Sequence, residues 1–158
     1  MKSTQTRIDI SLQNQELTVV HDGKPVRSFP VSSSRFGIGS EEGSMKTPTG
    51  RFRIAEKIGD GMPLGTVFKN RRRVRVTKKL MRDEDLVMTR ILWLDGLEPG
   101  LNRCGDVDTF ERYIYIHGTG DEPSLGRPAS HGCIHLSAAD LLPLYDLIPI
   151  GTLVWIAG

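Results

Sequence analysis

An Asp-Gly dipeptide between two apolar runs is the feature of the first thirty residues that most constrains the fold. The runs cover residues 17–20 and 26–31, and His21-Asp22-Gly23-Lys24 separates them. Asp-Gly in this setting is a strong signal for a tight β-hairpin turn. Ile8, Ile10 and Leu12 alternate with polar residues just before, as in a half-buried strand. The N-terminal third is therefore predicted to be a β-meander.

The rest of the chain continues mainly as strands. Residues 32–50 are rich in Ser, Gly and Pro and are predicted to form a long loop. Further strands are predicted at residues 51–55, 90–94, 112–116 and 151–156. One helix is predicted over residues 137–147, with Ser137 as N-cap and Asp140 three positions later. Pro143 lies inside it and predicts a kink, because an interior proline costs roughly 3 kcal/mol.

Composition limits the class of protein. A chain of 158 residues with 38% hydrophobic and 25% charged residues is typical of a globular protein, and residues 1–158 are predicted to form a single domain without repeats or linkers. A net charge of +2 argues against nucleic acid as a partner. The basic run at residues 69–79 lacks interleaved aromatic residues and is predicted to be a solvated strand or loop. No pattern predicts the oligomeric state.

The N-terminal residues carry a prediction about location. No apolar stretch approaches the ~18 residues that span a bilayer, so we expect no membrane insertion. Residues 1–7 lead directly into the first predicted strand, without an apolar segment or a small-residue cleavage site. We therefore expect a cytoplasmic protein or, if residues before Met1 are missing, a periplasmic one.

Histidine and cysteine cluster late in the chain. Three of the four histidines, His117, His131 and His135, lie within 19 residues that also contain Cys133. Gly132 allows a tight turn with positive φ, which would expose the thiol and direct consecutive backbone N–H groups to one side, as an oxyanion hole requires. A thiol of ordinary pKa ~8.5 needs a base to react at neutral pH. His117, at the end of a predicted strand, can supply that base.

Zinc binding is the main alternative for the same residues. On an extended strand His131, Cys133 and His135 would share one face, and His117 could complete a tetrahedral set. A glycine inside the run argues for a turn instead, and ligands separated by one residue are closer than the usual two to four. A zinc-dependent hydrolase that uses these four residues therefore stays the alternative. An ordinary buried thiol is the third interpretation.

Two segments resemble one known family. His117-Gly118-Thr119, followed by Ser130-His131-Gly132-Cys133-Ile134, resembles the signature of the L,D-transpeptidase (YkuD-type) catalytic domain. Upstream, the segment from Lys46 to Phe52 resembles that family's Thr-Pro-x-Gly-x-Phe stretch. The resemblance spans roughly residues 7–156. It implies a mainly β fold, a β-sandwich or barrel with one short helix after the catalytic cysteine.

The resemblance also implies a reaction. Such a domain is a cysteine acyl-transferase on peptidoglycan stem peptides or muropeptides, and it needs no cofactor or metal. By that likeness Cys133 attacks the third stem residue, D-alanine leaves, and a thioester forms. His117 serves as base and then acid, while the Gly118 carbonyl orients its ring. The N–H groups of Gly132 and Cys133 hold the oxyanion, and His131 shapes the site.

Substrate binding is predicted at three further residues, Ser130, His135 and Arg127. His135 stands where the family commonly has Arg or Asn, so it is expected to bind a substrate carboxylate more weakly than an arginine fork. An amine acceptor gives transpeptidation, and water gives L,D-carboxypeptidase activity in muropeptide recycling. The missing signal and wall-binding module favour the second. A non-catalytic peptidoglycan-binding module is a further alternative.

Overall fold

The computed structural model describes residues 5–83 and 85–158, and within them the chain is mainly β, as predicted. Residues 1–4, part of the stretch behind the prediction about location, lie outside the described residues. The strands are β1 (Thr6–Ser11), β2 (Glu16–His21), β3 (Lys24–Pro30), β4 (Gly50–Ile58), β5 (Val67–Lys69), β6 (Arg72–Val74), β7 (Val87–Gly96), β8 (Tyr115–Gly118), β9 (Ile134–Leu136) and β10 (Leu153–Ala157). The helices are η1 (Leu80–Arg82), η2 (Gly105–Val107), η3 (Glu122–Ser124) and α1 (Ala138–Leu147).

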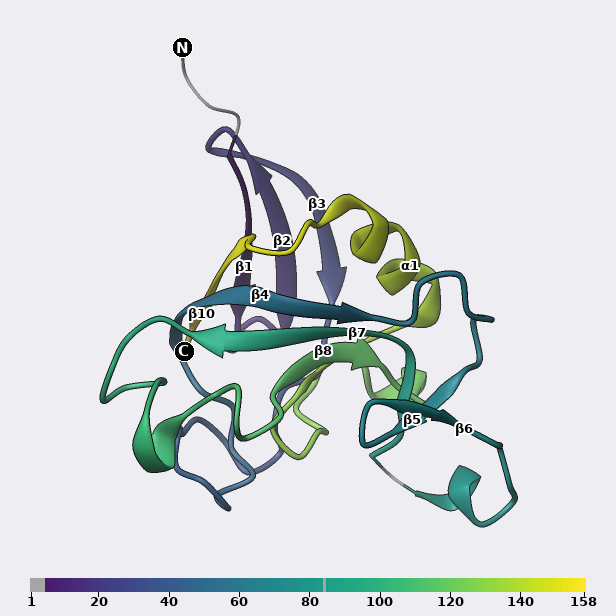
Figure 1. The fold of residues 1–158 in the computed structure, drawn as a ribbon. Coiled ribbons are helices and arrows are strands. Elements are labelled where there is room, and N and C mark those ends of the chain that lie inside the picture. Colours follow the sequence, from purple (N-terminus) through teal and green to yellow (C-terminus); the bar gives the residue numbers. More distant parts are fainter. Residues whose placement is uncertain (1–4, 84) are drawn as a thin grey trace.

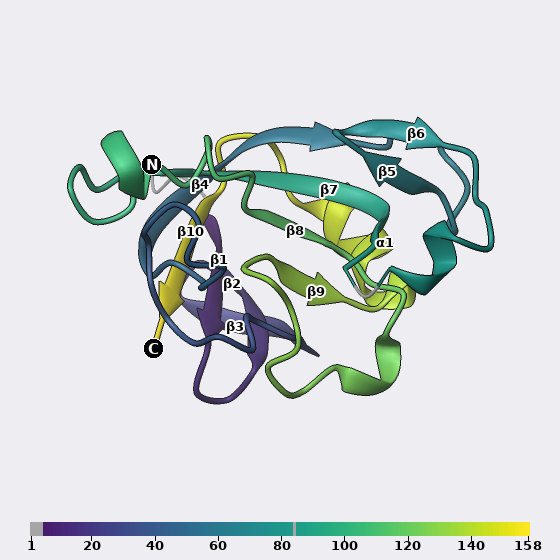
Figure 2. The ribbon, with the colours of Figure 1, turned by 90° about the horizontal axis from the view of Figure 1, so that it is seen from below.

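The strands form one mixed sheet that curls around the core (Figure 1). Its order is β3-β2-β1-β10-β4-β7-β5-β6, and β8 pairs with β7 and then with β9. The pairs β1–β10 and β8–β9 are parallel. Beyond β3, Ser32 exchanges two backbone hydrogen bonds with His135 of β9, at 2.9 and 3.1 Å. This isolated bridge brings the segment after β3 next to β9, while the sheet itself stays open and ends at β3 and β6 (Figure 2).

The predicted hairpin turn is confirmed in detail. Asp22 and Gly23 have φ values of 50° and 79°, and positive φ at both central residues is what a type I′ turn requires. A second hairpin, β5–β6, overlaps the start of the basic run, and its turn residues Asn70 and Arg71 have φ values of 50° and 63°. That turn was not predicted, because no glycine marks it.

Alternation along β7, β8 and β9 separates two apolar clusters. The inward face packs Leu92, Ile116 and Ile134 into the main core, together with Leu141 and Tyr145 of α1. The outward face carries a smaller cluster of Phe68, Ile91, Trp93 and Tyr115, with Cys133 packed against it. The histidine and cysteine side chains therefore lie on the outward face.

The predicted helix is confirmed, including its cap. The Ser137 hydroxyl accepts a hydrogen bond from the Asp140 N–H at 3.1 Å, and α1 continues through Pro143 to Leu147. The predicted strand at 112–116 is shorter than expected, because Tyr113 has a φ of 57° and the strand begins only at Tyr115. Of the helices described, none combines the length and the apolar character needed to cross a bilayer.

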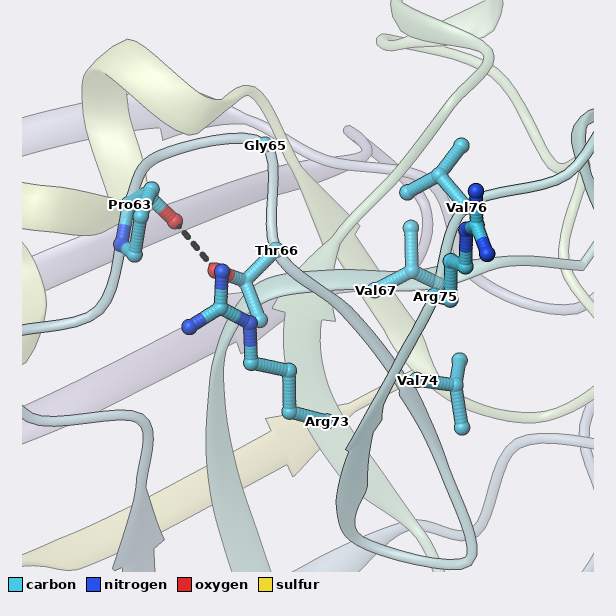
Figure 3. A pocket seen from close by; sticks show the side chains of 8 residues that line it. All are labelled: Pro63, Gly65, Thr66, Val67, Arg73, Val74, Arg75 and Val76. Carbon is cyan, nitrogen blue, oxygen red and sulfur yellow. Dashed lines mark hydrogen bonds between the residues drawn. The ribbon is translucent and has the colours of Figure 1, made fainter.

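A hollow of about 540 Å³ lies beside the β5–β6 hairpin (Figure 3). Its lining comes from residues 63, 65–67 and 73–76, which are mainly valines and arginines. None of these lining residues is a histidine, a cysteine or an acid. The histidine and cysteine side chains lie elsewhere, on the outward face of β8 and β9.

Candidate active site

Strand register brings the predicted residues together. In the parallel pair β8–β9, His117 is aligned with His135, and their ring centroids are 4.6 Å apart. Two residues before His117 on β8, the backbone N–H of Tyr115 donates a hydrogen bond to the Cys133 sulfur at 3.3 Å. Because side chains two positions apart share a face, His117 lies diagonally across from Cys133 on the same surface.

The thiol of Cys133 is half-buried among aromatic side chains. Burial raises its pKa to about 12, although the Tyr115 N–H and the charge of Arg112 act in the opposite direction. Its S–H lies 3.5 Å from the carbonyl oxygen of Tyr113, which can accept it. The resting cysteine is therefore a neutral thiol.

His117 is fully buried and has a fixed tautomer. Its Nδ1 lies 2.6 Å from the Gly118 carbonyl oxygen, and because a carbonyl can only accept, Nδ1 carries the proton. Its Nε2 therefore carries a lone pair, and among the described residues that atom has no hydrogen-bond partner. Burial, followed by the charge of His135, lowers the pKa of His117 to about 3. The imidazole is neutral and has a free basic nitrogen.

Gly132 and Ser130 build the turn before the cysteine. Gly132 has a φ of 129°, which confirms the predicted positive φ. The Ser130 hydroxyl donates to the Cys133 carbonyl at 2.6 Å and accepts from the Gly132 N–H at 3.1 Å. The Gly132 N–H, predicted to face an oxyanion, is thus already bonded, which leaves the Cys133 N–H for that task. Ser130, predicted to bind substrate, lies fully buried inside the turn.

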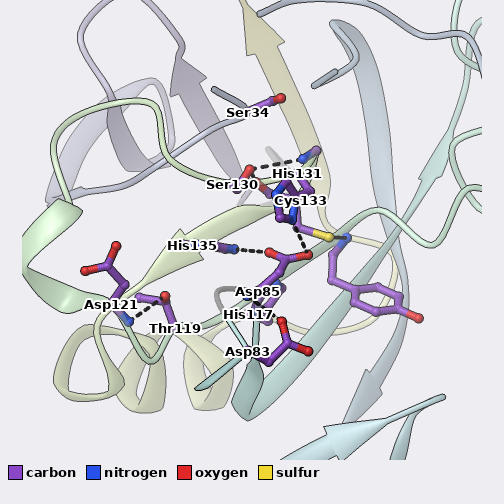
Figure 4. A network of polar contacts seen from close by, with 12 residues as sticks. Ser34, Asp83, Asp85, His117, Thr119, Asp121, Ser130, His131, Cys133 and His135 are labelled. Atoms are coloured by element: carbon purple, nitrogen blue, oxygen red, sulfur yellow. Dashed lines mark hydrogen bonds and ion pairs between the residues drawn. The ribbon is translucent and has the colours of Figure 1, made fainter. Parts of the chain in front are cut away.

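The two flanking histidines face one carboxylate, that of Asp85 (Figure 4). The His131 Nδ1 lies 3.3 Å from one Asp85 oxygen, and the His135 Nε2 lies 3.3 Å from the other. His131 Nε2 is 2.5 Å from a guanidinium nitrogen of Arg35; an arginine can only donate, so His131 carries its proton on Nδ1 and points it at Asp85. Neither histidine contacts Cys133 through a hydrogen bond within the part of the chain that the structure describes.

Asp85 was not anticipated from the sequence. It lies in the connection between β6 and β7, a charged and irregular stretch without a recognisable pattern. Burial alone raises its pKa, but the contact with His135 and the charges of His117, His135 and His131 outweigh burial and lower it to about 2. Asp85 is therefore an ionised carboxylate held against the site.

Arg112 is the second residue that the sequence did not single out. One guanidinium nitrogen, Nη2, donates to the carbonyl of Lys46 at 2.9 Å, next to the Gly132 turn. The other, Nη1, is buried and has no partner among the described residues. The charge of Arg112 acts on Cys133 and favours the thiolate. Burial lowers the pKa of Arg112 itself, but an arginine stays protonated.

Arg127 lies apart from these groups. It is exposed and lines a groove of about 480 Å³ together with Arg35, Arg82 and Asp121. Because Arg35 also contacts His131, the groove leads from the surface toward the cysteine turn. This location is compatible with binding of an anionic group, although Arg127 does not reach Cys133 through any contact among the described residues.

The donor atoms that could hold a metal differ from the predicted set. The ligand atoms of Asp85, His117 and His135 lie within 4.8 Å of one another. His131 and Cys133 do not belong to this group in the described part of the chain. The four-residue zinc site of a hydrolase is therefore not assembled here.

Comparison with known proteins identifies a matching family and solved structures with a similar fold. The family model of the L,D-transpeptidase catalytic domain, YkuD, matches residues 5–156. An L,D-transpeptidase from Mycobacterium smegmatis has 19% identity and a TM-score of 0.61, with 99% of this chain and 60% of that chain covered. L,D-transpeptidase 3 from Mycobacterium tuberculosis, in complex with a faropenem-derived adduct, has 19% identity and a TM-score of 0.61, with 99% and 61% covered.

A third solved structure agrees with these two. The L,D-transpeptidase from Xylanimonas cellulosilytica has 23% identity and a TM-score of 0.57, with 99% of this chain and 62% of that chain covered. At these identities the likeness shows the shared fold, and this chain spans about three fifths of the length of each relative. None of the curated protein sequences matches the chain.

Proposed function

The chain belongs to the YkuD family of L,D-transpeptidase catalytic domains, and from that membership we propose a cysteine acyl-transferase. Its substrate is the tetrapeptide stem of peptidoglycan, and the bond cleaved joins the third residue to the terminal D-alanine. The observation that carries the proposal is the position of Cys133 and His117 on the same face of β8 and β9. The basic nitrogen of His117 is free, and the Gly118 carbonyl fixes its tautomer.

In the acylation step the Cys133 sulfur bonds to the carbonyl carbon of the third residue. The thiol proton passes to His117 Nε2 and then to the departing amine of D-alanine, so the thioester forms as the peptide bond breaks. Negative charge that develops on the carbonyl oxygen is stabilised by the Cys133 N–H. The nearby guanidinium of Arg112 supplies the positive field.

The resting protonation states suit a protected nucleophile. Cys133 has a pKa near 12 and His117 a pKa near 3, so both are neutral over the whole range between. Transfer of the thiol proton is unfavourable in the resting site and accompanies attack on a bound carbonyl instead. The Asp85 carboxylate faces both His131 and His135, so a substrate carboxylate would compete with it for His135.

The thioester then reacts with an acceptor. An amine from a neighbouring stem gives a 3→3 cross-link, and water releases a tripeptide. Incubation with a disaccharide-tetrapeptide, followed by mass analysis, separates the two, because a dimer marks transpeptidation and loss of D-alanine alone marks hydrolysis. The proposal expects one or both products from the wild type and none from Cys133→Ala. Cys104→Ala removes the other, exposed cysteine and serves as the matched control.

Binding of the tetrapeptide without any release of D-alanine, in a protein with an intact fold, would contradict the proposal. It would favour the non-catalytic binding module instead. Activity that survives in Cys133→Ala would overturn the assignment of the nucleophile.

A further inference from the structure

Three buried ligand atoms converge beside the cysteine. They are Asp85 Oδ1, His117 Nε2 and His135 Nε2, and all three lie within 4.8 Å of one another. Each is buried and makes no hydrogen bond among the described residues, although Asp85 Oδ1 and His135 Nε2 face each other as an ion pair at 3.3 Å. His117 and His135 are also more than nine-tenths buried as whole residues. Buried polar atoms normally have a partner, so the unpartnered His117 Nε2 beside this ion pair indicates a missing one.

The distances fit a small cation after a slight contraction. Zinc bonds of about 2.1 Å in a tetrahedral site separate neighbouring ligand atoms by about 3.4 Å. Asp85 Oδ1 and His135 Nε2 are already 3.3 Å apart, so this pair needs no change. The remaining contraction involves His117, and a small movement of its ring or of the β6–β7 connection supplies it.

Neighbouring groups contact the same three ligands and fix their orientation, as is usual for metal ligands. His117 donates its other ring N–H to the Gly118 carbonyl at 2.6 Å, which directs the Nε2 lone pair inward. The second oxygen of Asp85 lies 3.3 Å from His131 Nδ1. The backbone N–H and C=O of His135 are both hydrogen-bonded to Ser32.

We propose that Asp85, His117 and His135 form a binding site for one divalent transition-metal ion of the Zn²⁺ type. Two imidazoles and one carboxylate suit zinc, whereas calcium and magnesium prefer oxygen ligands alone. Three protein ligands leave a fourth position open to water or to a substrate carboxylate. Cys133 is not a ligand in this arrangement.

Metal binding would inhibit the chemistry proposed above. The ion takes the His117 lone pair that otherwise accepts the thiol proton, and it also ties the β6–β7 connection to β8 and β9. This inhibitory effect rests on the proposed function, whereas the site itself does not.

Binding is tested on the whole chain by titration with Zn²⁺ in a calorimeter. The wild type is expected to bind one ion per chain, and Asp85→Asn and His135→Asn to bind at least about 10-fold more weakly. His21→Asn removes a histidine outside the site, on the exposed end of β2, and is expected to bind like the wild type. Equal binding by the wild type and both site variants would overturn the proposal.

Cobalt gives an independent measurement that needs no variant. Co²⁺ added to the wild type is expected to show the visible bands of tetrahedral or five-coordinate nitrogen and oxygen ligation, without a thiolate charge-transfer band. A strong thiolate band would place the metal on Cys133 and overturn the ligand set.

Turnover separates this proposal from the proposed function. Zinc is expected to abolish release of D-alanine, and a chelator to restore it. Zinc that binds with the expected ligand dependence and leaves turnover unchanged would support the site and contradict the role of His117 as base.

Discussion

The Thr47 hydroxyl donates a hydrogen bond to the Gly132 carbonyl at 2.9 Å, although 85 positions separate the two residues. Thr47 is fully buried and also accepts from the Ser34 N–H at 2.9 Å. The Thr-Pro segment that resembles the family pattern is therefore a brace for the cysteine turn. It positions Cys133 without touching it.

Replacing Thr47 with valine tests this brace. Thr47→Val keeps the shape but leaves the Gly132 carbonyl and the Ser34 N–H without their partner, so the free energy of unfolding is expected to fall by ~1–3 kcal/mol. Thr49→Val changes a half-buried neighbour in the same segment and serves as control. Urea denaturation compares the two variants, and equal stability would argue against the brace.

Gly132 is expected to tolerate no side chain. Its φ of 129° is strained for any other residue, and an added Cβ would lie 3.4 Å from both the Ile114 side chain and the Lys46 carbonyl. We expect Gly132→Ala to lose ~1–3 kcal/mol of stability and to react more slowly at Cys133. Gly65→Ala, at an open position with ordinary φ, is the control. Differential scanning calorimetry would refute the expectation if both variants melted together.

Local sequence pattern accounts for most of the fold, and the features that it misses depend on long-range contacts. Asp22-Gly23 marks its hairpin because glycine accepts positive φ, whereas Asn70-Arg71 adopts the same turn without that marker. Arg71 is held there by contacts that no sequence window contains, over the rings of Trp93 and Tyr113. The isolated bridge between Ser32 and His135 is likewise a long-range pairing.

The site, like the fold, has residues that local pattern predicts and residues that it misses. The motif and its glycine were sufficient to place Cys133 in a turn, and His117 at a strand end. Asp85 and Arg112 reach the site only through tertiary packing, and neither stands in a recognisable motif. The hydrogen bond that occupies the Gly132 N–H also depends on a side-chain rotamer, that of Ser130, which sequence does not reveal.

Arg112 is expected to support the thiolate. Arg112→Gln keeps a donor near Lys46 but removes the charge, so alkylation of Cys133 by iodoacetamide and release of D-alanine should both slow by about 10-fold or more. Arg103→Gln removes an exposed arginine outside the site and should leave both rates unchanged. Unchanged alkylation in Arg112→Gln would show that its charge does not act on the sulfur.

The site makes the fold sensitive to acid. The pKa of His117 is about 3 when folded and 6.5 when unperturbed, so the unfolded chain binds this proton more readily as the pH falls from 6.5. Asp85, with a folded pKa of about 2 against 3.8, contributes stability that is lost below 3.8. Both groups lower the free energy of unfolding as the pH falls, so Tm should fall steadily from pH 6.5 toward 3.

The variant His117→Gln isolates the histidine contribution. Its Tm should depend less steeply on pH between 6.5 and 3.8 than that of the wild type, whatever its absolute stability. Identical slopes for wild type and His117→Gln would contradict the assigned burial of a neutral imidazole.

The central claim is that Cys133 carries the acyl group, and intact-mass analysis of the protein after rapid mixing with a disaccharide-tetrapeptide tests it most directly. The account predicts a transient adduct equal to the substrate mass less D-alanine, located by peptide mapping on Cys133, present in Cys104→Ala and absent in Cys133→Ala. Release of D-alanine by Cys133→Ala at the wild-type rate, or an adduct on another residue, would contradict it.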